Sequence, residues 1–277
     1  MLLATLLALG SAFVHASWNL VIKTSKVDRG IAAWGVFTCA GVIAVPLLVV
    51  VGLPGWSAAP WIALTALVHI AYLRTLSSAF THGDFGAVYP VARGGGALLA
   101  AIGGALFLGD DLSALAWCAL LVVAVGLVSM RSSGGTKGLG WALLTAACIG
   151  TYSVIDAHGA RVSASGASYG ISLAPATLVT VSTVGLLRGE GAALRAAWPT
   201  ERRRWALGGA CTLAAYTMVM IAVRHAPVGY VTMLRESSVL LGALAGWLLL
   251  KEGLAARRLV AAGVILGGLA LLVATTG

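Results

Sequence analysis

The chain has 277 residues, of which 60% are hydrophobic and only 10% are charged, and its mean hydropathy is +0.97. A soluble globular domain is about 25% charged, because its surface must face water, so this composition excludes an ordinary soluble protein. The net charge of +9 would suggest a nucleic-acid partner in a soluble chain. Here most Lys and Arg residues lie between apolar runs, where they orient a protein in a membrane, and we expect no nucleic-acid partner.

The apolar runs are typical of transmembrane helices. Inside a bilayer every backbone N–H and C=O must be hydrogen-bonded within the protein, which leaves helices or closed barrels. The runs are long and often continuous, and they lack the alternation of barrel strands. Because about 20 apolar residues cross a bilayer, we predict an all-α integral membrane protein with ten transmembrane helices, at residues 2–22, 31–51, 61–80, 86–107, 113–130, 139–158, 168–187, 205–224, 228–250 and 256–274.

The first predicted span carries polar and aromatic residues near its end. It lacks the basic n-region of a secretory leader and nine further apolar runs follow, so we interpret it as a retained span. His15 lies one turn before Asn19, which is the only asparagine of the chain. We predict that His15, Trp18 and Asn19 belong to a substrate-binding site. Packing in the core or at the membrane interface is the alternative for Trp18.

The third and fourth spans contain further polar positions. His69 and Tyr72 on the third span are three residues apart, which places them on one helix face. In the fourth span, Pro90 removes a backbone donor, and Gly94 and Gly95 allow the chain to bend or another helix to approach. We predict a hinge at Pro90, Gly94 and Gly95, with ordinary close packing as the alternative.

Charged residues within the fourth and ninth spans need a partner, a cavity or a function, because a charge at the bilayer centre costs about 2.5–3.5 kcal/mol. One interpretation is a buried ion pair of Arg93 and Glu236 that fixes helix packing. The other is a cavity in which Arg93 or Arg235 binds a substrate carboxylate and Glu236 binds an ammonium group. We place in this predicted substrate-binding site, beside the first-span residues, Tyr89, Arg93, Tyr152, Arg235 and Glu236.

Basic residues gather in the loops on one side of the predicted membrane. Loops after even-numbered spans contain only Arg161 and Arg224. Because Lys and Arg accumulate on the cytoplasmic side, both termini are predicted to face away from the cytoplasm, and we expect a bacterial inner (plasma) membrane location. The loops after odd-numbered spans contain Lys23, Lys26, Arg29, Arg131, Lys137, Arg188, Arg195, Arg202, Arg203, Arg204, Lys251, Arg257 and Arg258.

The chain also contains an internal repeat. The segment 86–96 matches 229–239 at a shift of 143 residues, which makes Arg93 and Glu236 equivalent. We predict one membrane domain of two five-helix halves, 1–131 and 138–277. Five is odd, so the halves would insert in opposite orientations around a central cavity, the arrangement used for alternating access. Chance similarity between Ala/Leu/Gly-rich helices is the alternative.

Several segments carry a resemblance to a known family. His15-Ala-Ser-Trp-Asn19 with Lys23, the segment Gly83-Asp-Phe-Gly-Ala-Val-Tyr-Pro-Val-Ala-Arg-Gly94, and the pairs Gly109-Asp110 and Lys251-Glu252 resemble EamA-type carriers of the drug/metabolite transporter superfamily. The resemblance covers essentially the whole chain. It implies a cavity lined by helices one to four and six to nine, and substrates such as amino acids, other metabolites or drugs. It also implies cytoplasmic termini, opposite to the loop charges, and we follow the charges.

Other classes of function lack their motifs. The sequence has no GxxxxGK[ST] loop for ATP and no GxSxG or HExxH, and its four cysteines are far apart without metal spacing. We therefore predict no enzyme activity, catalytic residue, metal or cofactor. A passive pore would need rings of like residues from an oligomer.

The prediction is a secondary transporter, an exporter or facilitator, of amino acids or similar small metabolites. A multidrug or cationic-metabolite efflux carrier is the alternative, and an integral membrane enzyme is a weaker one. The partners are a small-molecule substrate and the lipid bilayer, and the protein is a monomer or homodimer. Glu236, Asp84 or His15 could couple a proton, whereas a uniporter needs no titrating group.

Overall fold

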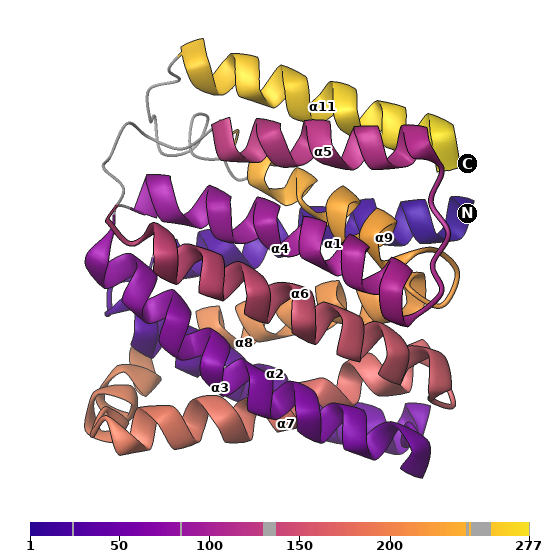
Figure 1. The fold of residues 1–277 in the computed structure, drawn as a ribbon. Coiled ribbons are helices and arrows are strands. Elements are labelled where there is room, and N and C mark those ends of the chain that lie inside the picture. The colour runs from indigo at the N-terminus through magenta and orange to yellow at the C-terminus, as the bar shows by residue number, and fades with distance from the viewer. Residues whose placement is uncertain (24, 84, 130–136, 242–243, 245–255, 277) are drawn as a thin grey trace.

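A computed structural model describes residues 1–23, 25–83, 85–129, 137–241, 244 and 256–276, with the backbone alone for 19–23, 85–87 and 256–259. These residues are all-helical, as predicted (Figure 1). The helices are α1 Leu2–Lys23, α2 Arg29–Val51, the 3-10 helix η1 Trp56–Ala58, α3 Ala59–His82, α4 Phe85–Phe107, α5 Ala114–Ser129, α6 Leu139–Val162, α7 Gly166–Leu187, α8 Gly191–Ala222, α9 Val228–Arg235 and α11 Ala256–Thr276.

The protein is an integral membrane protein. Among the described helices, α2, α3 with η1, α4, α6, α7 and α8 are each long and apolar enough to cross a membrane. Large apolar side chains lie exposed on the outside of the bundle, including Phe13, Val50 and Leu187. A water-facing protein rarely exposes so continuous an apolar surface, whereas lipid favours it.

One predicted boundary was wrong. We expected the eighth span to begin at 205, after a polar loop, but α8 already begins at Gly191. The charged residues Arg202, Arg203 and Arg204 are therefore helical, because a helix can continue beyond the apolar layer when its own apolar face is packed. Trp205 and Ala197 supply that packing on this stretch, since both are buried in one cluster with residues of α2.

The ninth predicted span is interrupted. Helix α9 ends at Arg235, Glu236 has φ −66° and ψ −12°, and helical backbone resumes at 237–241. The Glu236 N–H donates to the carbonyl of Met233 at 3.0 Å, and the Val239 N–H donates to the carbonyl of Glu236 at 2.9 Å. Both bonds span three residues instead of four, so the helix is locally tightened at the charged pair.

Most of the helix packing joins helices of the first half of the sequence to helices of the second half. Helix α6 lies along α3 and α4, whereas α1 lies along α8 and α9, and α5 packs on α11 at one edge of the bundle (Figure 1). The two termini lie at the same end of the bundle, and the connection between α7 and α8 lies at the other.

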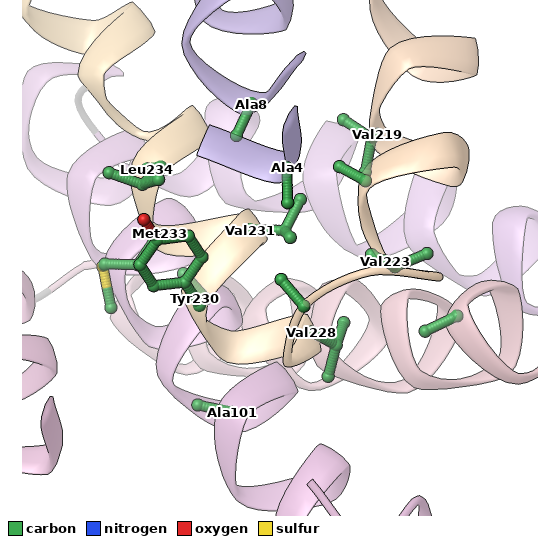
Figure 2. Packing of buried hydrophobic residues seen from close by; sticks show 14 of the residues in the cluster. Ala4, Ala8, Ala101, Val219, Val223, Val228, Tyr230, Val231, Met233 and Leu234 are labelled. Carbon is green, nitrogen blue, oxygen red and sulfur yellow. The ribbon is translucent and has the colours of Figure 1, made fainter. Parts of the chain in front are cut away.

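Helix α9 is buried at the centre of the main core. Tyr230, Val231, Met233 and Leu234 are at most 1% exposed and pack with residues of α1, α4 and α8 (Figure 2). Gly229 permits close contact with α4, since a Cβ there would lie 2.3 Å from that of Ala101. This contact holds the charged end of α9 at a fixed depth beside α4.

Candidate functional site

Arg93 and Glu236 form an ion pair inside the bundle. The Arg93 Nε donates to Glu236 Oε2 at 3.1 Å, and its Nη2 donates to Oε1 at 2.5 Å. The two side chains are only 9% and 5% exposed. This two-point geometry is the strong form of an arginine–carboxylate contact, and it joins α4 to the tightened turn after α9. The contact that the repeat predicts is therefore formed.

Arg235, the neighbour of Glu236, points to a different set of partners. Its Nη2 lies 3.2 Å from His15 Nδ1, which also accepts a hydrogen bond from Trp18 Nε1 at 2.9 Å. Because both partners are donors, Nδ1 acts as an acceptor, which requires an unprotonated Nδ1. The Arg235 guanidinium also lies over the ring of Tyr216, 5.5 Å from its centroid.

The charge of Arg235 is incompletely satisfied. Its buried Nε has no hydrogen-bond partner, and no carboxylate of the described residues forms an ion pair with it. A cavity of about 10 Å³ adjoins it, lined in part by Ser153, Tyr216 and Thr232, which is room for about one water molecule. An arginine N–H that is left unpaired inside a protein is costly, so this group is suited to an incoming acceptor.

Aromatic side chains surround the two arginines. Tyr152 stacks on His69 with ring centroids 4.7 Å apart, and Tyr72 meets Tyr152 edge-on at 5.7 Å. Tyr72, Tyr89 and Tyr152 are all close enough to Arg93 to interact with it electrostatically. The polar face predicted on the third span therefore lies against the sixth, beside the ion pair.

The structure brings most of the predicted site residues into one region, although their binding roles stay predictions. His15, Trp18 and Arg235 form one chain of contacts, while Arg93 and Glu236 form the adjacent pair. The remaining residues are Tyr89 and Tyr152, which interact electrostatically with Arg93, and Asn19, whose side chain is outside the described part, as is all of Asp84.

The predicted hinge residues lie in a continuous helix. Helix α4 runs through Pro90 from Phe85 to Phe107. A Cβ on Gly94 would lie 3.1 Å from the Cβ of Leu127, and one on Gly95 would lie 3.1 Å from the Cβ of Ala146. Both glycines thus allow α5 and α6 to approach closely. Bending at these positions stays a prediction.

Sequence reasoning missed a buried carboxyl beside the site. Asp156 of α6 is 0% exposed and accepts hydrogen bonds from three hydroxyl groups, those of Thr65, Tyr169 and Tyr216. Its position inside a predicted span was a sufficient signal, because an ionisable residue at that depth is costly and usually functional.

A second cluster that we did not predict lies at the end of the bundle near the termini. Asp110 Oδ1 forms an ion pair with Arg161 Nη1 at 2.7 Å, and Asp110 Oδ2 accepts from the Val228 N–H at 2.6 Å. Arg161 Nε also donates to the carbonyl of Val223 at 2.8 Å. These contacts tie the α4–α5 connection to the end of α6 and the start of α9.

The described residues of this region carry charged and aromatic groups that are typical of recognition sites. Within the described residues, no group of three or more His, Cys, Asp or Glu side chains could hold a metal ion. The groups available are two arginines, a carboxylate and several aromatic rings. They suit recognition of a carboxylate, an ammonium group or an apolar side chain.

The fold is shared with a protein of known structure. One crystal structure of a protein aligns with 99% of this chain and 98% of its own, with a TM-score of 0.78 and 19% sequence identity. No curated protein matches the sequence. The sequence profile of the EamA-like transporter family matches residues 136–274, which is half of the chain. Together with the helical membrane fold, this match shows that the chain belongs to the EamA-like transporter family.

Proposed function

We propose that this secondary transporter carries amino acids, or similar small metabolites with a carboxylate, by alternating access. The observation that carries the proposal is Arg235, a guanidinium in the middle of the bundle whose Nε lacks a partner among the described residues. A substrate carboxylate would accept from Arg235 and complete its hydrogen bonding.

The neighbouring ion pair supplies the groups for the other end of an amino acid. Glu236 directly follows Arg235 in the sequence, and Arg93 balances its negative charge. A zwitterionic substrate would place its carboxylate on Arg235 and its ammonium group near Glu236. The aromatic rings of Trp18 and Tyr152 would then contact the substrate side chain. The Arg93–Glu236 pair would thus both fix the packing of the helices and take part in substrate binding.

An alternating-access mechanism is supported by the way in which helices of each predicted half pack against the other half. Helix α6 packs on α3 and α4, and its repeat counterpart α1 packs on α8 and α9. The family match at 136–274 nearly coincides with the predicted second half, 138–277. Both observations favour two related five-helix units, in which rocking of one against the other would expose the site to each side in turn.

The proposal is tested by counterflow in proteoliposomes. Vesicles loaded with one unlabelled solute are placed in trace radiolabelled solute, using a panel of amino acids, amines lacking a carboxylate, and sugars. We expect saturable exchange of one or more amino acids and none of the matching amines. Arg235→Gln should abolish exchange, while Arg74→Gln, the same change on an exposed residue of α3, should not.

A cationic-metabolite or multidrug efflux carrier is the competing function, and one observation favours it. Glu236 and several aromatic rings, including Tyr152 and Trp18, lie in one region, a combination that suits organic cations. In that case the amines would exchange as well as the amino acids. This result would contradict the amino-acid proposal.

A further inference from the structure

We propose that the Asp156 carboxyl binds and releases a proton during the transport cycle, so that transport is coupled to proton movement. The part of this inference that concerns coupling rests on the proposed transport function, whereas proton binding by Asp156 does not. The step is the addition of one proton to the Asp156 carboxylate, and its release to water completes the cycle. No other reactant is needed.

The site around Asp156 is built from several helices. Thr65 Oγ1 of α3 donates to Asp156 Oδ1 at 2.6 Å, Tyr169 of α7 donates to the same oxygen at 3.1 Å, and Tyr216 of α8 donates to Oδ2. Gly159, one turn along α6, leaves room for this, since a Cβ there would lie 2.3 Å from the Tyr169 hydroxyl oxygen. A side chain at 159 would push that hydroxyl away from the carboxyl.

The Asp156 carboxyl has no ion-pair partner within the described structure. An ionised carboxylate buried without an opposite charge is unfavourable, even when hydroxyl groups donate to it. The neutral acid can donate one hydrogen bond and accept others from the same hydroxyls. Both protonation states are therefore compatible with this site, which a proton-binding group requires.

Each helix that packs around Asp156 carries an ionisable group near it. These groups are His69 on α3, Arg93 on α4, Tyr152 on α6 itself, Tyr169 on α7, Tyr216 on α8, Arg235 at the end of α9 and Glu236 directly after it. His69 donates from Nδ1 to the carbonyl of Thr65 at 2.9 Å. Of the two carboxyls in this set, Glu236 is paired with Arg93, whereas Asp156 is hydrogen-bonded by hydroxyl groups.

Tyr216 connects the carboxyl to the substrate region. Its hydroxyl group binds Asp156, and its ring lies under the Arg235 guanidinium. The ionised Asp156 Oδ2 can only accept hydrogen bonds, whereas a protonated Oδ2 can also donate one. Protonation therefore changes the hydrogen bond between Asp156 and the Tyr216 hydroxyl. Because that ring supports Arg235, proton binding at Asp156 and substrate binding at Arg235 act on the same side chain. Coupling follows from this shared contact.

Infrared spectroscopy tests proton binding without any substrate. The purified protein in lipid is titrated with acid and base, and the C=O stretching band of protonated carboxylic acid is recorded. The chain has nine Asp and Glu residues, so we expect one titrating component of this band to be present in the wild type and missing in Asp156→Asn. Asp28→Asn, which changes an exposed helix cap, should retain that component. Identical bands in the wild type and Asp156→Asn would overturn the assignment.

A gentler variant guards against misfolding of Asp156→Asn. Tyr216→Phe removes one hydroxyl group and leaves the carboxyl in place. We expect the same infrared band to remain but to titrate at a different pH, because one of the three hydrogen bonds is gone. An unchanged midpoint would contradict the hydrogen-bonded site described here.

Coupling is tested by comparing two transport measurements on the same vesicles. The first is counterflow of the amino acid that the wild type exchanges, and the second is its accumulation under imposed pH gradients of either sign. The ratio of pH-driven accumulation to counterflow should fall to the no-gradient level in Asp156→Asn. A ratio equal to that of the wild type would refute coupling through Asp156. Absence of counterflow in the wild type would instead refute the proposed function, with the infrared result unaffected.

Discussion

At the scale of single residues, the two adjacent charges at the end of α9 have different environments. Glu236 is matched by Arg93, while Arg235 contacts His15 and Tyr216 and keeps an unpaired Nε within the described structure. Two arginines at similar depth are thus not equivalent. One completes a structural pair, and the other has bonding capacity left for a ligand.

We expect Glu236→Gln to destabilise the protein, because Arg93 would lose its buried counter-charge. Breaking such a pair from one side costs about 3–5 kcal/mol, whereas removing both charges costs much less. The double variant Arg93→Met/Glu236→Met should therefore be more stable than Glu236→Gln alone. Thermal unfolding of the three proteins in detergent measures this, and equal stability of Glu236→Gln and wild type would contradict a buried pair.

The residues that could be predicted from sequence were those marked by the repeat. Arg93 and Glu236 are equivalent at a shift of 143 residues, and they meet. The three hydroxyls on Asp156 could not be predicted, because Thr65, Tyr169 and Tyr216 come from three helices with no shared spacing. Such a cluster depends on how helices are rotated about their axes, which hydropathy does not specify.

At the scale of helices, spans were predicted well where apolar length alone decides. The predicted 31–51 and 86–107 became α2 at Arg29–Val51 and α4 at Phe85–Phe107. The predicted start of α8 was wrong, because the part of a helix that lies outside the lipid is not apolar on every side. Hydropathy alone therefore does not mark it as helical. The turn at Glu236 was also not predicted, since no Pro or Gly marks it.

Helix contacts through glycine give a test at this scale. A Cβ on Gly96 would lie 2.5 Å from Ile149 Cγ2, so Gly96→Ala should force α4 and α6 apart. Overpacking of this kind costs about 1–3 kcal/mol, and a lower thermal unfolding temperature is expected. Gly263→Ala is the matched control, because a Cβ there would meet no described atom within 4 Å. Equal shifts for both variants would contradict the described packing.

At the scale of the whole molecule, the ends of the bundle differ. At the end near the termini, Asp110 joins Arg161 to the start of α9. The end at the α7–α8 connection carries Arg188, Arg202, Arg203 and Arg204. In alternating access, contacts that close one end must break when that end opens.

Removing Asp110 should therefore favour opening at the end near the termini. The reporter is Thr232→Cys, beside the small cavity, in a background with the four native cysteines replaced. Loss of about 1.4 kcal/mol from the closed state would raise labelling by an impermeant maleimide about tenfold. Asp110→Ala should show this increase, and Asp111→Ala, its exposed neighbour, should not. Equal labelling in both would exclude Asp110 as a closing contact.

The membrane orientation predicted from loop charge has a separate test. We expect a C-terminal alkaline phosphatase fusion to be active in a bacterial host and a C-terminal green fluorescent protein fusion to be dark, because this terminus is predicted to lie outside the cytoplasm. The reverse pattern would mean that the basic loops lie outside the cytoplasm.

The tightened turn after α9 has a mechanical consequence. Successive residues of a helix point about 100° apart, so Arg235 and Glu236 engage different neighbours, α1 and α8 for one and α4 for the other. A rotation of α9 that keeps one side chain in place must draw the other away from its partner. The end of this helix would then have two favoured settings, with few stable positions between them.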